Sequence, residues 1–273
     1  MPKRWSKKWS GQLSNSDTPT LALMSAMQEE LSCILERLQA TPVQVGSRTY
    51  WQAQWMGQPV VAVLSRIGKV AAATTASCLI EHFGATQLVF SGVAGSLDDR
   101  VQVGDVVIAS ELMQHDMDAS PLFPKYQIPL TQKSLFTTNE LLTQELKSAA
   151  VQCQQEIGSN MQTQGMWDLL GLANKKIGLH EGLILSGDQF ISSAKKSEAL
   201  KLSLPQALAV EMECAAVAQV CDDYGVPFAA FRIISDKAND TAHLDFEKFI
   251  QTVAAPFGAH VIEAFISNRA GSR

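Results

Sequence analysis

Short apolar runs alternate with segments of helical spacing along most of the chain. The first apolar run, at 20–26, is followed by Leu31, Ile34, Leu35 and Leu38, whose spacing places them on one face of a helix. The same two patterns recur as far as the C-terminal region. They predict strands at 20–26, 48–56, 59–65, 87–91, 105–109, 182–186, 208–211 and 228–235, and helices around 31–38 and at 67–83, 139–154, 214–224 and 246–267.

This alternation is typical of an α/β sandwich, in which helices cover both faces of a sheet. We find no internal repeat and no linker that divides the core, so we expect a single domain spanning 19–270. Residues 1–18, where Lys and Arg alternate with Trp and Ser before a polar stretch, are expected to form a disordered tail or a short surface-docking arm. The proline-containing segment 120–132 and the polar segment 157–176 are expected to be surface loops, the second with room for a short helix around Trp167.

Composition and charge narrow the class of protein. Hydrophobic residues make up 46% of the 273 positions and charged residues 18%, which is ordinary for a globular protein with a sizeable core. The net charge of −5 argues against a nucleic-acid binder, because such proteins usually present a basic face. No apolar run reaches the roughly 18 residues of a transmembrane helix. The basic N-terminus also lacks the apolar core of a secretory signal, so we expect a cytoplasmic protein.

Metal and cofactor motifs are not found in the sequence. The five cysteines are scattered, with no CxxC pair and no histidine at zinc-finger distance, and we expect them to be reduced and mostly buried. GxGxxG and GxxxxGK[ST] loops are also missing. The sequence therefore predicts neither a metal nor a cofactor.

Acidic side chains follow several of the predicted strands. Glu30 follows the first strand, Glu211 and Glu213 stand where a strand meets a helix, and Asp236 follows the 228–235 strand. Phe190 comes shortly after another strand. Each acid taken singly could equally be a helix-terminus or turn residue. Because ligands of α/β sheets gather outside the carboxyl ends of strands, their joint occurrence predicts one binding site.

The motifs around these residues occur in the order found in a known family. They are AMQEE (26–30), IGKVAAA (67–73), SGVAG (91–95), VGDVV (103–107), SGDQF (186–190), VEME (210–213) and IISD (233–236). The chain from about Leu21 to Phe265 thereby resembles the methylthioadenosine/S-adenosylhomocysteine nucleosidases of the purine nucleoside phosphorylase superfamily. This resemblance implies a single-domain three-layer α/β/α sandwich with a central mixed sheet.

The resemblance also implies an activity, which is hydrolysis of the N-glycosidic bond of 5′-thio-substituted adenine nucleosides, as in methionine salvage. Asp236 matches the acid that protonates the purine at N7, and Glu30 matches the base that activates water toward C1′. Such acid–base steps are typically worth ~10²–10⁴-fold each. Glu213 matches the carboxylate that holds the ribose hydroxyls.

Further substrate contacts are implied by the same motifs. Met212 would pack under the ribose, Phe190 would stack on the base, and Ser235 would orient the acid. The implied substrate-binding residues are Ala26, Met27, Ala94, Gly95, Phe190, Ile191, Glu211, Met212, Glu213, Arg232, Ser235, Leu122 and Phe123.

Leu122 and Phe123 belong to the 120–129 loop, which in the family crosses a homodimer interface and lines the partner's 5′-substituent pocket. Three positions depart from the family pattern. Val93 stands where a hydroxyl residue is common, Arg66 stands where a small residue is usual, and the 120–129 loop differs in length and sequence. His115 is expected to be structural.

Three alternatives remain open from the sequence. A phosphorylase on the same fold would need cations beside the ribose, and Arg66 is the nearest candidate. A hydrolase of another 5′-modified nucleoside, such as futalosine, would keep the chemistry and change the substrate. A non-catalytic nucleoside-binding protein would keep the pocket without turnover.

Overall fold

A computed structural model describes residues 19–157, 177–239 and 246–271. The predicted tail at 1–18 and nearly all of the 157–176 segment lie outside the described residues. The elements are β1 (Leu21–Ser25), α1 (Gln28–Leu35), β2 (Thr41–Val45), β3 (Arg48–Trp55), β4 (Gln58–Leu64), α2 (Lys69–Phe83), β5 (Gln87–Ser96), β6 (Val106–Gln114), β7 (Phe136–Thr137), α3 (Glu140–Ile157), β8 (Leu179–Ser186), α5 (Ala194–Ser203), β9 (Ala207–Glu211), α6 (Cys214–Tyr224), β10 (Phe228–Asp236), α7 (Phe246–Phe249), a π-helix (Ile250–Ala254) and α8 (Ala255–Gly271).

The sheet is mixed, as the resemblance implied. Strands β4, β1, β5 and β10 lie side by side and run parallel, whereas the β2–β3, β3–β4 and β10–β6 pairs are antiparallel. At its far end β5 also pairs with β9, at Gly95–Val210 and Ser96–Ala209. Five strands, β5, β10, β6, β8 and β9, therefore close on themselves at this end of the sheet.

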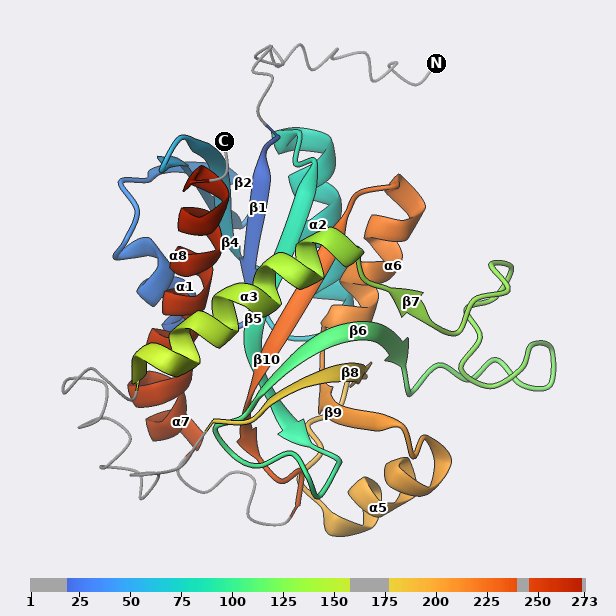
Figure 1. Cartoon of the computed structure of the whole chain (residues 1–273). Coiled ribbons are helices and arrows are strands. Elements are labelled where there is room, and N and C mark those ends of the chain that lie inside the picture. Colours follow the sequence, from blue (N-terminus) through green and yellow to red (C-terminus); the bar gives the residue numbers. More distant parts are fainter. Residues whose placement is uncertain (1–18, 158–176, 240–245, 272–273) are drawn as a thin grey trace, which may run out of the picture.

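Helices cover both faces of the sheet (Figure 1). One hydrophobic cluster packs α1, α3 and α8 against one face, and a second packs α2 and α6 against the other. The predicted α/β/α sandwich is therefore confirmed. The C-terminal helical segment, Phe246–Gly271, is long and apolar enough to cross a membrane. However, 72% of its most apolar stretch is buried within the protein, as in a core helix.

Most predicted elements are present, and two regular segments longer than two residues, β2 and α5, were missed. β2 contains Pro42 and is largely exposed at the edge of the sheet, so its sequence carries no strong alternation. The helix α5 buries only Ser197 and has no apolar stripe for a periodicity to reveal. The strand expected at 87–91 continues to Ser96 as β5, so the glycine-containing segment expected beyond the strand is part of it.

Candidate active site

A cavity of about 360 Å³ opens where β1, β5, β9 and β10 end. Twelve of the thirteen substrate-binding or catalytic residues expected in the core motifs line it, the exception being Gly95. They are Ala26, Met27, Glu30, Ala94, Phe190, Ile191, Glu211, Met212, Glu213, Arg232, Ser235 and Asp236. Segments far apart in the chain thus converge on one site, as the strand-end argument predicted.

Glu30 stands in the first turn of α1, just after β1. Its Oε2 accepts hydrogen bonds from the backbone N–H groups of Ala26 and Met27, both at 3.0 Å. Burial of this carboxyl raises its pKa to about 7, although the Arg232 guanidinium and the backbone hydrogen bonds lower it. A carboxylate whose pKa lies near neutrality is well suited to act as a general base.

Asp236 ends β10 at a small irregularity in its pairing with β5. Its Oδ2 accepts a hydrogen bond from the Ser235 hydroxyl at 2.8 Å, and its Oδ1 accepts one from the Ala238 N–H at 2.7 Å. Burial raises the pKa of Asp236, against the opposite effect of these two hydrogen bonds. The net effect stabilises the protonated form of Asp236 relative to an exposed aspartate.

Glu211 and Glu213 have different surroundings although they are two residues apart. Glu211 forms an ion pair with the buried Arg232, whose Nη2 lies 2.7 Å from Oε2. It also accepts hydrogen bonds from Ser186 Oγ and from the backbone N–H groups of Glu213 and Cys214 at the start of α6. The Glu211 carboxylate is therefore held by protein donors on several sides, and it anchors the strand-to-helix junction.

Glu213 is held by one described donor, the backbone N–H of Gly68, at 2.8 Å from its Oε1. Burial and the neighbouring Glu211 raise the pKa of Glu213, whereas Arg232 lowers it. The rest of this carboxyl faces the cavity. It is the acid of the pair that is available to a ligand.

The glycines of β5 make room for the buried carboxyls of the cavity. A Cβ on Gly92 would stand 3.1 Å from Arg232 Nη1 and 3.2 Å from Glu30 Oε1, and one on Gly95 would stand 2.9 Å from Asp236 Oδ1. Their missing side chains admit Glu30, Arg232 and Asp236.

The cavity also includes residues that the sequence did not single out as ligand contacts. They are Ile67, Gly92, Val93, Gln189, Val210 and Phe246. Phe246 begins the C-terminal helical segment and meets the Phe190 ring edge-on, with centroids 5.8 Å apart. Phe246 lies in an apolar helix with no motif around it, so only the fold could reveal this aromatic pair.

Besides Gly95, three residues discussed from the sequence as ligand contacts or cation candidates do not line this cavity. Leu122 is 84% exposed on the loop between β6 and β7, and Phe123 neighbours it. Within one chain neither reaches the cavity, so their assignment to a partner's pocket stays a prediction. The guanidinium of Arg66 donates to the backbone oxygen of Ser47 at 2.6 Å and likewise stays outside the cavity.

His115 is buried, and burial lowers its pKa. Its ring packs against Gly187, where a Cβ would lie only 2.3 Å from Nε2. The next residue, Asp116, binds Lys69 Nζ at 2.6 Å and the backbone N–H of Asp188 at 2.9 Å. Asp116 thus ties the start of α2 to the loop after β8, and the structural role expected for His115 stays a prediction.

The chain is similar to known proteins over most of its length. A sequence model of the phosphorylase superfamily matches residues 20–267. A 5′-methylthioadenosine/S-adenosylhomocysteine nucleosidase of Staphylococcus aureus (strain JH9) is 33% identical over 249 residues, which cover 90% of this chain and 99% of that protein. The chain belongs to this nucleosidase family within the phosphorylase superfamily.

Two solved structures of the superfamily are closely similar to the chain. Futalosine hydrolase of Helicobacter pylori strain 26695 superposes with a TM-score of 0.79 at 31% identity, covering 92% of this chain and 98% of its own. A 5′-methylthioadenosine/S-adenosylhomocysteine nucleosidase from Neisseria meningitidis, in complex with methylthio-immucillin-A, gives a TM-score of 0.79 at 29% identity, covering 91% and 99%. Both are named as enzymes of nucleoside cleavage.

The close approach at Gly92 gives a prediction for this family member. Gly92→Ala should displace Arg232 or Glu30 by a few tenths of an ångström and lower kcat/KM by up to ~10²-fold, since small misplacements of catalytic groups are costly. Steady-state adenine release measures the effect. Gly258→Ala is the matched control, because its Cβ would meet nothing closer than Ile233 Cδ1 at 3.6 Å. Equal activity of the two variants would contradict this account of Gly92.

Proposed function

We propose that this protein hydrolyses the N-glycosidic bond of methylthioadenosine and S-adenosylhomocysteine, releasing adenine and the thioribose. The observation that carries the proposal is the placement of Glu30 and Asp236 in one cavity, in surroundings that raise the pKa of both carboxyls. Hydrolysis of a glycosidic bond needs one acid and one water-activating base. The family relationship supplies the substrate class.

In the proposed mechanism Asp236 donates its proton to purine N7 as the C1′–N9 bond breaks. Glu30 takes a proton from the attacking water, whose oxygen bonds to C1′. Glu213 accepts hydrogen bonds from the ribose hydroxyls, and in its ionised form its charge favours the oxocarbenium-like transition state. After turnover Glu30 holds a proton and Asp236 has lost one, so proton exchange with solvent restores both groups.

Other residues position these groups in the proposal. Arg232 and Ser235 contact the acids Glu211 and Asp236 directly, and so orient them. Phe190, with Phe246 against its edge, offers an aromatic face to the base. Neither a metal nor a cofactor takes part in these steps.

A phosphorylase would need a cation free to bind phosphate beside the ribose. Among the described residues that line the cavity, Arg232 is the only one with a cationic side chain, and it is 1% exposed and paired with Glu211. Arg66, the candidate from the sequence, is turned toward Ser47. These contacts favour water over phosphate as the nucleophile.

The substrate assignment can be tested by direct assay. The purified full chain is incubated with methylthioadenosine, S-adenosylhomocysteine, adenosine, inosine and futalosine, with and without phosphate, and free base is measured. We expect base release from the two thio-substituted substrates without phosphate. Strict phosphate dependence would overturn hydrolysis, and preference for futalosine would assign the activity named for the Helicobacter pylori neighbour. Tight binding without turnover would identify a binding protein.

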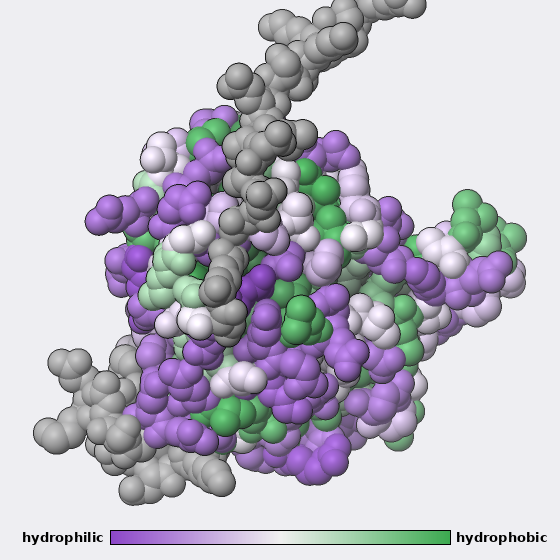
Figure 2. Space-filling model, turned by 45° about the horizontal axis from the view of Figure 1, so that its top comes forward, coloured by the Kyte–Doolittle hydropathy of each residue, from purple (hydrophilic) through white to green (hydrophobic). Residues whose placement is uncertain are grey.

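The proposal includes a homodimer that acts in the cytoplasm. The loop between β6 and β7 projects as an arm, and Figure 2 shows apolar residues on the projection at the side of the molecule. Its Leu122 and Leu130 are 84% and 89% exposed, which is unusual for large apolar side chains outside an interface. The loop 120–129 is the part of the chain that we propose to contact the partner and to complete its 5′-substituent pocket.

The five free cysteines suit a reducing compartment.

A further inference from the structure

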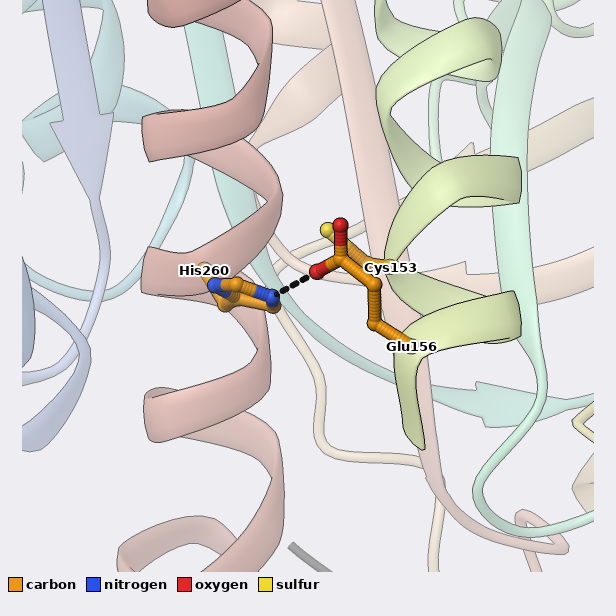
Figure 3. Close-up of side chains that lie close together, drawn as sticks. All are labelled: Cys153, Glu156 and His260. Carbon is orange, nitrogen blue, oxygen red and sulfur yellow. Dashed lines mark hydrogen bonds and ion pairs between the residues drawn. The ribbon is translucent and has the colours of Figure 1, made fainter. Parts of the chain in front are cut away.

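A second group of chemically reactive side chains lies at the contact between α3 and α8. Cys153 and Glu156 project from α3 and His260 projects from α8, as Figure 3 shows. The Cys153 sulfur, a Glu156 carboxylate oxygen and a His260 ring nitrogen all lie within 4.8 Å of one another. None of the three residues lines the active-site cavity, so the nucleosidase chemistry leaves the group unexplained.

The packing of the two helices sets the geometry of this group. Cys153 and Glu156 are three residues apart and so share one face of α3. Cys153 is fully buried in the hydrophobic cluster that joins α3 to α8. The side chains of Glu156 and His260 are 44% and 39% exposed. The group thus has a fixed inner donor and two outer donors that an ion can reach from solvent.

We propose that Cys153, Glu156 and His260 bind one Zn²⁺ ion. Thiolate sulfur, imidazole nitrogen and carboxylate oxygen are the ligands that Zn²⁺ takes in proteins, in tetrahedral geometry. Three protein ligands leave a fourth position for water, on the solvent side where Glu156 and His260 are exposed. Ca²⁺ and Mg²⁺ prefer sets made wholly of oxygen ligands, so the thiol and the imidazole favour zinc over either.

A carboxylate lies near the second nitrogen of the His260 ring, although not within hydrogen-bond distance of it. The ring Nε2 lies 2.8 Å from Glu156 Oε2, and the ring Nδ1 lies 4.0 Å from Glu263 Oε2. The Glu263 carboxylate is itself held by Arg37, just after α1, whose Nε lies 2.9 Å from Oε2. Histidines that bind metal with one nitrogen usually donate the other N–H to a carboxylate, which fixes the ring. Glu263 can serve in this way while Nε2 turns to the ion.

Binding requires the thiol of Cys153 to lose its proton. Burial, with a smaller effect of Glu156, raises the pKa of this thiol to about 12. The proton leaves to solvent as the sulfur–zinc bond forms, and the charge of the ion replaces it. Without an ion the same residues form a Glu156–His260 ion pair beside a buried thiol, and the experiment must separate these two states.

The test uses the full chain without an affinity tag, treated with a chelator and then dialysed. Co²⁺ is titrated first, because a thiolate ligand gives it a near-ultraviolet charge-transfer band and tetrahedral geometry gives it intense visible bands. We expect one Co²⁺ per chain with both features, and displacement of Co²⁺ by Zn²⁺. Calorimetric titration with Zn²⁺ alone should give the same stoichiometry.

Matched variants assign the ligands. Cys153→Ser should abolish the charge-transfer band, whereas Cys221→Ser, which alters another buried cysteine in α6, should leave it unchanged. His260→Asn should weaken Zn²⁺ binding by at least ~10-fold and Glu263→Gln by ~10–100-fold, the usual range for loss of a supporting carboxylate. Both residues are partly exposed, and adenine release by each variant checks its fold independently of metal.

Two results would overturn the proposal. One is a wild-type chain that binds no stoichiometric Co²⁺ or Zn²⁺, which would leave an ordinary ion pair at this position. The other is binding that lacks the charge-transfer band or survives both Cys153→Ser and His260→Asn, which would place the ion elsewhere. Failure here leaves the proposed nucleosidase activity untouched, because the two sites share no residue.

Discussion

Asp236→Asn is expected to lower kcat for adenine release by ~10²–10⁴-fold, the usual worth of a positioned general acid. The amide is nearly the same size as the carboxyl. Its oxygen can still accept from the Ala238 N–H, and its NH₂ group can donate to the Ser235 hydroxyl oxygen. It cannot deliver a proton to the purine, so the base must leave as an anion. Single-turnover measurement of base release at saturating substrate reports this step.

Two controls separate lost chemistry from lost structure. Asp222→Asn makes the same substitution at a partly exposed surface pair with Lys133 and should leave turnover unchanged. A ribosyl substrate whose leaving group departs as a stable anion, such as a nitrophenolate, should lose much less rate in Asp236→Asn than the adenine nucleoside does. Equal losses with both substrates would contradict the role of Asp236 as the acid.

Glu30→Gln is expected to reduce kcat over a similar range, ~10²–10⁴-fold, by removing the base that takes a proton from water. The glutamine oxygen can still accept from the N–H groups of Ala26 and Met27, so binding of an unreactive substrate analogue should persist. Calorimetry with such an analogue, beside the kinetic assay, measures both quantities. Near-normal turnover in this variant would refute the assignment.

The pH dependence of kcat/KM should follow from the ionisation of the Glu30 carboxyl. Glu30 must be ionised to act as a base, and its pKa lies near 7, so wild-type kcat/KM should fall as pH drops below about 7. Asp236 must be protonated, and its raised pKa extends the protonated form to higher pH than an ordinary aspartate allows. The residual activity of Glu30→Gln should not show this fall of kcat/KM at low pH.

The free energy of unfolding should fall as Glu30 ionises, whereas activity should rise. The pKa of Glu30 is raised in the folded state, from an ordinary 4.5 to about 7, so the protonated form favours folding. This contribution is fully present below pH 4.5 and is lost as the pH rises through 7. Between these values the Tm of the wild type should fall relative to that of Glu30→Gln. The proposed base thus costs stability at the pH at which it is ionised.

Much of the fold could be predicted because apolar periodicity records burial directly. The helix at 214–224 has the predicted bounds, and the central strands differ from prediction mainly at their ends. The misses share one physical cause. β2 and α5 bury little apolar surface, so neither leaves a strong pattern in the sequence.

The candidate site, like the fold, could be predicted from the sequence only in part. The acids could be placed at strand ends from their order in the chain, but the state of each carboxyl could not. Glu211 and Glu213 occupy similar positions in VEME, yet one is held by Arg232 and the start of α6 and the other faces the cavity. Desolvation and hydrogen bonding depend on groups more than 100 positions away, such as Gly68 beside Glu213.

The sequence by itself determined the α/β class, the acids of the site and, through its motifs, the nucleosidase family. These are properties of local patterning, which records which faces are buried and which residues follow a strand. Only the tertiary structure decided that β5 and β9 close one end of the sheet, that Gly92 and Gly95 admit the carboxyls, and that Cys153 meets His260. Such contacts join distant segments through the packing of whole elements, and no spacing along the chain encodes them.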